Sequence, residues 1–333
     1  MNGIYFVMSL VVFLSLAFDF INGFHDTANA IATMVSTRAL TPRLAILMAS
    51  VMNFVGALSF TGVAKTIGGG IADPAKLAHG EWVVIAALLG AIAWNLLTWR
   101  FGIPSSSSHA LIGGMAGAVV ASAGFGELNA GGFMNIVKGL IFSPLLAFGF
   151  GFALMRVLKR LFAGSNPHTV NRKFRACQVI TGAVQAFTHG TNDAQKGMGI
   201  ITFALVSAKL QDNLEVPLWV KISAAAAMAL GTSFGGMRII RTLGTKIFKI
   251  EPINGFAADI GSASVIFGAT LIHFPVSTTH VITSSILGVG SAKRFSGVKW
   301  DTAARIVVSW LITIPIAMTL SAVIYETISV LFL

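Results

Sequence analysis

The sequence is short of charge. Asp, Glu, Lys and Arg make up 11% of its 333 residues, whereas soluble domains contain roughly 25%. Hydrophobic residues account for 55%, and the mean hydropathy is +0.81. These values exclude a disordered chain, a nucleic-acid-binding module and an ordinary cytosolic enzyme. A membrane-crossing helix needs about 20 mostly apolar residues, so there is room for roughly ten crossings and for no soluble domain. We therefore expect an all-α polytopic membrane protein.

Cysteine and acidic residues are scarce as well. The single cysteine, Cys177, rules out an internal disulfide. The 12 acidic residues stand against 23 Lys and Arg, an excess that in a membrane protein reflects basic cytoplasmic loops. Residues 1–18 lack the basic region and the small-residue cleavage site of a signal peptide. We expect them to form the first membrane helix.

The chain contains an internal repeat, because two motifs and one proline recur at nearly one spacing. The matching positions are Gly23 with Gly190, Asp26 with Asp193, Pro104–His109 with Pro275–His280, and Pro144 with Pro315. We expect two related halves, residues 1–160 and 174–333. A basic cytoplasmic linker, residues 161–173, joins them.

Loop charge predicts that the second half is inverted. In each pair of matching loops one member is basic and the other is not: 38–43 against 209–217, 236–251 (Arg238, Arg241, Lys246 and Lys249) against 64–81, and 293–299 against 124–135. The basic loop belongs to the first half in the first pair and to the second half in the other two. No pair has two basic loops, as the positive-inside rule requires when matching loops of an inverted repeat lie on opposite sides of the membrane. With five crossings per half, both termini would lie on the extracellular side of the cell membrane.

Two long apolar runs contain polar clusters. The runs 4–39 and 174–208 would each extend about 50 Å as one helix, against about 30 Å of hydrocarbon. We expect both to break at their polar residues, 22–26 and 188–193. Broken or re-entrant helices that meet at the midplane form the substrate site of many secondary transporters with inverted repeats.

Ionisable residues at these positions indicate a function. Asp26, Asp193 and Lys196 each cost roughly 2.5–3.5 kcal/mol at the centre of a membrane helix. Ion pairs that only hold a bundle together are the alternative, but duplication in both halves favours a site. Carboxylates repel a bare anion, so their partner is a coupling cation or a substrate proton. Asn29 follows Asp26 by one helical step, and Lys196 takes the matching place after Asp193.

Each half also has a hydroxyl-rich segment that follows a proline and starts a helical run. Free N–H groups and hydroxyls at a helix N-terminus can bind a tetrahedral oxyanion, although ordinary N-capping is the alternative. The hydroxyl residues are Ser105, Ser106, Ser107, Ser108, Ser277, Thr278 and Thr279. His109 and His280 follow them and either bind substrate, carry a proton or only bond a neighbouring helix.

The remaining polar residues of the apolar runs have less specific interpretations. His25 and His189 flank the Asp motifs and carry the same alternatives as the other two histidines. Asp19 is a candidate proton relay. Asp259 has no counterpart in the first half, and we interpret it as structural.

The segments Gly23–Ala30 (GFHDTANA) and His189–Gly197 (HGTNDAQKG) resemble the paired signature of the inorganic phosphate transporter (PiT) family. The resemblance covers essentially the whole chain. It implies symport of inorganic phosphate with protons or sodium, an inverted-repeat helical fold in the bilayer and a homodimer. We expect no enzyme activity, no resident metal and no cofactor beyond the co-transported ion. The positions that match the family's substrate and coupling-ion motif are Asp26, Asn29, Asn192 and Asp193, with Thr191 a further substrate candidate.

Lys196 departs from the pattern of sodium-coupled members, in which both signatures tend to end in a small polar amide. Gln195-Lys196-Gly197 resembles the bacterial proton-coupled branch instead. An ammonium three residues after Asp193 can reach that carboxylate on a helix. It would then replace a mobile cation and exclude sodium. Direct contact between Lys196 and phosphate is the alternative.

Several other functions stay open at this point. They are a permease for sulfate or another tetrahedral oxyanion, a sodium-coupled phosphate symporter, a passive channel, and an intramembrane hydrolase using Ser105 and His109. Phosphate near neutral pH carries an O–H that can donate to a carboxylate, whereas sulfate does not. Two acids at the site therefore favour phosphate. The hydrolase motifs H-E-x-x-H and G-x-S-x-G do not occur.

Overall fold

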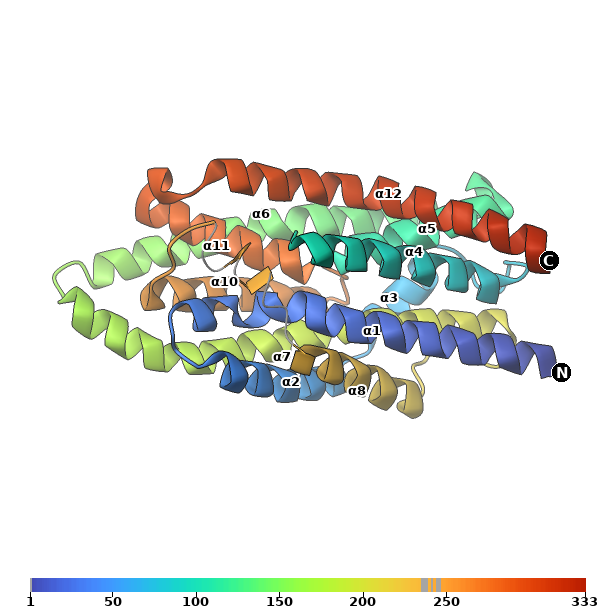
Figure 1. Cartoon of the computed structure of the whole chain (residues 1–333), viewed down its shortest axis with the longest axis horizontal. Helices are drawn as coiled ribbons and strands as arrows, with labels where there is room; N and C mark the ends of the chain where they lie inside the picture. The colour runs from blue at the N-terminus through green and yellow to red at the C-terminus, as the bar shows by residue number, and fades with distance from the viewer. Residues whose placement is uncertain (1, 235–238, 241, 244–246) are drawn as a thin grey trace.

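A computed structural model describes residues 2–234, 239–240, 242–243 and 247–333. Arg238, Arg241 and Lys246 of the basic loop lie outside the described residues. The first half contains α1 (Asn2–Ser36), α2 (Pro42–Ser59), α3 (Gly62–Gly70), α4 (Gly80–Phe101), α5 (Ser107–Ala123) and α6 (Ala130–Leu161). The second half contains α7 (Pro167–Ser207), α8 (Leu218–Phe234), α10 (Pro252–Leu271), α11 (Thr278–Arg294) and α12 (Trp300–Phe332). The helices lie side by side along one axis (Figure 1).

The expected class of protein is confirmed. Five of the described helices, α1, α2, α4, α6 and α12, are long and apolar enough to cross a membrane. Large apolar side chains such as Phe6, Leu146 and Leu311 are exposed on the outer faces. Water would not support so much exposed apolar surface, whereas lipid does. The chain is a multi-pass membrane protein.

The two halves are inverted and interlocked. α1 begins at the end that holds both termini, and α7 begins at the opposite end (Figure 1). α5 packs along α12, and its counterpart α11 packs along α6. Likewise α2 packs along α7, and α8 packs along α1. Each half therefore depends on the other for its buried contacts.

Glycines permit this close packing at matching positions. A Cβ atom on Gly117 would overlap the carbonyl oxygen of Met318, and one on Gly288 would overlap that of Phe148. Gly117 therefore lets α5 approach α12 closely. Its counterpart Gly288 does the same for α11 and α6.

The expected break at residues 22–26 is wrong, and so is the break at 188–193. Both α1 and α7 run through these residues as continuous helices. At about 1.5 Å per residue both exceed the hydrocarbon thickness, which a helix accommodates by tilting or by extending beyond the bilayer. Polar side chains do not break a helix when they point into a protein interior, because the backbone hydrogen bonds stay intact.

Interruptions of the expected kind occur instead at the prolines. Gly102 directly follows the end of α4, and His273 lies two residues after the end of α10; both have left-handed backbone, at φ 65° and 60°. Pro104 and Pro275 follow, and a proline disfavours helical backbone in the residue before it. The next helices begin directly afterwards, with Ser106 capping α5 and Ser277 capping α11.

Loops of different charge separate to the two ends. The α5–α6 and α7–α8 connections lie at the end with the termini (Figure 1), where Lys65 pairs with Glu215 at 3.5 Å. The α1–α2, α6–α7 and α11–α12 connections lie at the opposite end. There Lys159 Nζ donates to the carbonyl of Lys293 at 3.4 Å. The basic segments 38–43, 161–173 and 293–299 therefore share one end, and residues 167–173 of the expected linker form the first turns of α7.

Candidate functional site

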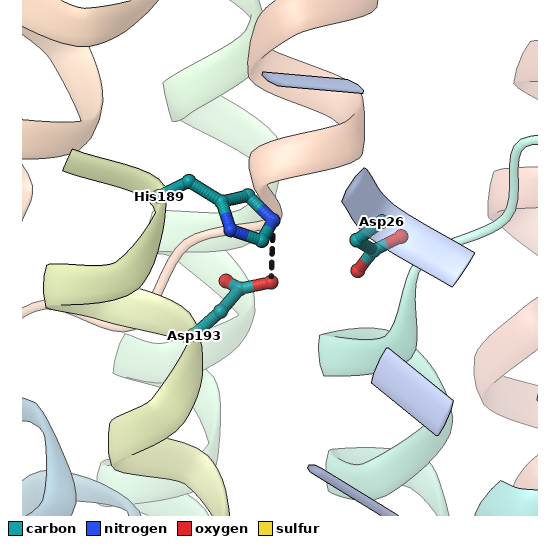
Figure 2. Close-up of side chains that lie close together, drawn as sticks. All are labelled: Asp26, His189 and Asp193. Carbon is teal, nitrogen blue, oxygen red and sulfur yellow. Dashed lines mark ion pairs between the residues drawn. The ribbon is translucent and has the colours of Figure 1, made fainter. Parts of the chain in front are cut away.

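Two buried carboxylates face each other at the middle of the bundle. Asp26 lies on α1 and Asp193 on α7, and the side chains are 1% and 0% exposed (Figure 2). The N-termini of α5 and α11 reach the same place. The two long helices and the two proline interruptions, which lie far apart in the sequence, thus meet at one site.

Asp26 accepts hydrogen bonds from three helices. Ser107 Oγ of α5 donates to Oδ2 at 2.8 Å, and Thr279 Oγ1 of α11 donates to Oδ1 at 2.9 Å. On α1 itself, His25 Nδ1 lies 2.9 Å from Oδ1, and Asn29 Nδ2 donates to it at 3.3 Å. Asn29 also donates to Thr279 at 2.7 Å. Hydroxyls from both halves therefore converge on one carboxylate.

Asp193 has a partly matching environment. Thr278 Oγ1 donates to its Oδ2 at 3.1 Å, and Thr278 is the repeat counterpart of Ser107. Lys196 Nζ lies 2.6 Å from Oδ1, so the contact expected from helical spacing is present. His189 Nε2 lies 3.3 Å from Oδ2 (Figure 2). The main asymmetry between the two acids is thus an ammonium at one and an amide, Asn29, at the other.

Asn22 and Ser107 connect the two acids. Asn22 Nδ2 donates to Asp193 Oδ2 at 3.4 Å, and Ser107 Oγ lies 2.8 Å from Asn22 Oδ1 as well as from Asp26. A hydroxyl has one proton, so Ser107 donates to only one of these oxygens at a time. The network can therefore rearrange without movement of the backbone. Asn22 is not among the site residues predicted from the sequence. Its position one helical turn before Asp26 places both on the same face of α1 and could have indicated a role at the site.

The other hydroxyl candidates bind backbone groups or side chains other than the two acids. Ser105 Oγ donates to Thr98 at 2.7 Å, and Ser108 Oγ donates to the carbonyl of Val276 at 2.9 Å. Ser106 and Ser277 accept the first free N–H groups of their helices, from His109 and His280. Of the predicted hydroxyl set, Ser107, Thr278 and Thr279 alone contact the acids among the described residues.

Thr191 and Asn192 lie beside the second interruption rather than at the acids. Asn192 Nδ2 donates to the carbonyl of Phe274 at 3.3 Å, and its Oδ1 accepts from the N–H of Val276 at 3.3 Å. Thr191 Oγ1 donates to the carbonyl of Thr188 at 2.7 Å. The contacts of Asn192 fix the α10–α11 connection against α7. A substrate role for the two residues stays a prediction.

His109 and His280 pair with each other, away from the acids. Their ring centres are 4.3 Å apart, and His280 stacks on Trp310 at 3.9 Å. Both line a mainly apolar cavity of about 760 Å³ between α6 and α12. The other histidine pair, His25 and His189, lies at the acids. In the sequence, only His25 and His189 are close to the aspartates, and this proximity distinguishes them from His109 and His280.

A second polar cluster extends from the site toward the basic end. Asp259 of α10 is buried and accepts from Thr33 Oγ1 of α1 at 2.7 Å and from Thr181 Oγ1 of α7 at 3.2 Å. One helical turn further, Thr37 Oγ1 donates to Gln178 at 2.7 Å. We call this cluster the polar lane. Toward the termini, the same two helices bury mostly apolar side chains, among them Val11, Phe18, Ile200 and Phe203, and only isolated polar ones such as Ser15 and Thr202. Asp19, on the terminal side, is buried against Gly197.

The acids also form a potential cation site. Asp26, His189 and Asp193 each offer a ligand atom, and these atoms lie within 4.8 Å of one another. Carboxylate and imidazole together suit several metal ions. Lys196, however, already contacts one oxygen of Asp193. The absence of a resident metal stays a prediction.

Comparisons with known proteins agree on one family. The model of the "Phosphate transporter family" matches residues 22–170 and 163–321. A "Probable low-affinity inorganic phosphate transporter" of Bacillus subtilis (strain 168) is 58% identical over 97% of both chains. A protein of the same name from Rhizobium meliloti (strain 1021) is 47% identical over 95% of this chain and 94% of its own. A solved structure, "The sodium-dependent phosphate transporter", matches with a TM-score of 0.87 at 24% identity, over 98% and 100% of the chains. That structural match supports the fold alone.

Proposed function

Because the chain belongs to the phosphate transporter family, we propose that it carries inorganic phosphate across the membrane by symport with protons. Membership places it among transporters and not among enzymes. The observation that carries the proposal is the meeting of two buried carboxylates with hydroxyls from two opposed helix N-termini, supplied by both halves of an inverted repeat.

Phosphate suits this mixture of groups. Its unprotonated oxygens accept hydrogen bonds from hydroxyls and from the positive N-terminal ends of α5 and α11. Its remaining O–H donates to Asp26 or Asp193. Ser107 and Thr278 now donate to these carboxylates, so substrate entry exchanges one set of hydrogen bonds for another. Sulfate lacks the O–H and leaves an acid unmatched, which selects against it.

Proton coupling follows from Lys196 in this proposal. Its ammonium is 1% exposed and 2.6 Å from Asp193, where a mobile cation would otherwise bind. The tethered charge leaves no place for sodium there. Asp26, with His25 rather than a fixed cation beside it, then carries the transported proton. Sodium coupling, and direct contact between Lys196 and phosphate, are the competing schemes.

The polar lane indicates the direction of release. It leads from Asp26 past Asp259 to the basic end, and basic loops lie in the cytoplasm. Both termini would then be extracellular, and the mostly apolar packing on their side would seal the outer path. We propose alternating access between this arrangement and its inverse. The homodimer implied by the resemblance is part of the proposal.

Transport by the purified protein tests the function. Proteoliposomes would receive labelled phosphate under an imposed proton gradient, under an imposed sodium gradient, or under both. We expect concentrative uptake with the proton gradient alone, abolished by an uncoupler and unaffected by excess sulfate. Uptake that equilibrates without concentrating would indicate a channel. Uptake that needs sodium would contradict proton coupling, and competition by sulfate would contradict phosphate selectivity.

Asp212→Asn is a matched control for variants of the site. Asp212 is exposed, in the α7–α8 connection. Its loss changes the net charge as Asp26→Asn does. It leaves every contact of the site intact, so uptake should stay at the wild-type level.

A further inference from the structure

A second cavity lies at the basic end, apart from the transport site. It has a volume of about 610 Å³ and is enclosed by the end of α6, the start of α7, and parts of α10 and α11. Its wall is apolar, with the buried side chains Met155, Leu158 and Val170. Its rim is basic, with the side chains Arg156, Lys159, Arg160 and Lys293.

The positive charge of this rim is mostly uncompensated. Among the described residues that line the cavity Glu251 is the single acid, and it pairs with Lys293 at 2.7 Å. Arg156, Lys159 and Arg160 form no ion pair with any described residue. Cations near the end of a helix favour its dipole, and cytoplasmic loops are basic in general. Neither effect explains why an apolar cavity lies beneath the cations.

A basic rim above an apolar wall suits a ligand that has both an anionic group and an apolar chain. Cations at the rim bind a phosphodiester, and the apolar wall accommodates an acyl chain. Basic pockets between membrane helices bind anionic lipid headgroups on this principle. The wall also holds Asn171, whose buried Oδ1 has no hydrogen-bond partner among the described residues. It can accept from a headgroup hydroxyl.

We propose that this cavity binds an anionic glycerophospholipid of the phosphatidylglycerol type. The phosphodiester contacts Arg156, Lys159 and Arg160, and one acyl chain lies along Met155 and Leu158. Free inorganic phosphate shares the charged group but has nothing to place against the apolar wall. The bound lipid joins α6 and α7, and thereby the two halves of the repeat, at their junction.

Retention of lipid by the purified protein tests the proposal. The protein would be reconstituted with equal parts of phosphatidylglycerol and phosphatidylcholine, extracted in mild detergent and examined by native mass spectrometry. We expect phosphatidylglycerol to be retained over phosphatidylcholine. In the variant R156Q/K159Q/R160Q retention should fall by about tenfold or more, because each basic side chain near the headgroup contributes separately. The control R43Q/R172Q/R175Q removes three exposed cations from the same end, outside the cavity, and should retain lipid normally.

Equal loss in both triple variants would show nonspecific attraction to the basic end and would overturn the proposal. Equal retention of the two lipids by the wild-type protein would do the same. A second measurement needs no variant. A phosphatidylglycerol with a diazirine in its acyl chain should label wild-type residues 155–171. Excess unlabelled phosphatidylglycerol should prevent this labelling, and excess inorganic phosphate should not. Labelling elsewhere only, or protection by phosphate, contradicts the lipid site.

Discussion

The ammonium nitrogen of Lys196 lies 2.6 Å from Oδ1 of Asp193, three residues earlier on α7, and both side chains are buried. A buried ion pair gains little over an apolar pair, but removal of one partner leaves an uncompensated charge that costs about 3–5 kcal/mol. Without Lys196, the buried carboxylate of Asp193 would be unpaired and would bind another cation strongly. Substitution of Lys196 therefore tests whether its ammonium takes the place of a mobile cation.

Lys196→Asn should make the protein responsive to sodium. The amide resembles Asn29 in the first half and leaves Asp193 free to bind a mobile cation. We expect thermal stability of the variant to rise with added sodium chloride but not with choline chloride. Phosphate uptake should become sodium-dependent. The wild-type protein should show neither response.

Lys65→Asn is the matched control, because Lys65 is half exposed and pairs with Glu215 at the surface. It should stay insensitive to sodium. If Lys196 binds phosphate directly, the variant Lys196→Asn should instead lose phosphate affinity and gain no response to sodium. A wild-type protein that requires sodium would exclude the tethered-cation scheme at the outset.

Asp26→Asn and Asp193→Asn should both abolish concentrative uptake, since each removes a proton-accepting carboxylate from the site. In the proposed scheme the first variant loses the carboxylate that carries the proton, and the second loses the partner of Lys196 and an acceptor for the substrate O–H. The two variants should differ in stability. Asp26→Asn removes a buried charge that has no fixed cation, whereas Asp193→Asn leaves the Lys196 ammonium unpaired. We expect the melting temperature of Asp193→Asn to be the lower one. Wild-type uptake in either variant, measured beside Asp212→Asn, would remove that residue from the mechanism.

Much of this architecture could be predicted from the sequence, because its causes are local. Composition determines the membrane class, and recurrence of Asp26 at Asp193 and of Pro104 at Pro275 reveals the repeat. Polar clusters in the sequence mislocate the interruptions, because a polar side chain does not by itself break a helix. The backbone decides instead: proline at 104 and 275 removes an N–H, while Asn22 and Asp26 leave the hydrogen bonds of α1 intact.

The set of residues that form the site is harder to predict, because it depends on how helices from the two halves pack against each other. Asp26 and Thr279 come from opposite halves, and their 2.9 Å hydrogen bond follows from packing that no local pattern encodes. Ser107 and Ser108 are neighbours on α5, yet one contacts Asp26 and the other a carbonyl of the second interruption. Helical geometry points adjacent side chains about 100° apart, so a cluster of hydroxyls in sequence is not a cluster in space.

Gly288→Ala should destabilise the protein through the contact between its halves. The added Cβ meets the carbonyl oxygen of Phe148 on α6, and overpacking of this kind typically costs about 1–3 kcal/mol. Gly149→Ala is the matched control on α6, because a Cβ there meets no neighbouring atom. The melting temperature should fall in the first variant and hold or rise slightly in the second. Equal melting temperatures would show that α6 and α11 can separate without cost.

The neighbouring serines of α5 provide the sharpest test of the substrate site. Ser107→Ala removes a donor that contacts Asp26 and Asn22, within reach of any anion held between the two helix N-termini. A hydrogen bond to a charged group is worth about 1.5–3 kcal/mol, so phosphate affinity should fall roughly tenfold or more. Ser108→Ala deletes the same atom one residue later, where it donates to the carbonyl of Val276. That variant should lose thermal stability and keep its phosphate affinity. Phosphate binding by isothermal titration would separate the two outcomes. Affinity that falls equally in both would mean that the α5 hydroxyls act through the fold of the interruption and not on the anion.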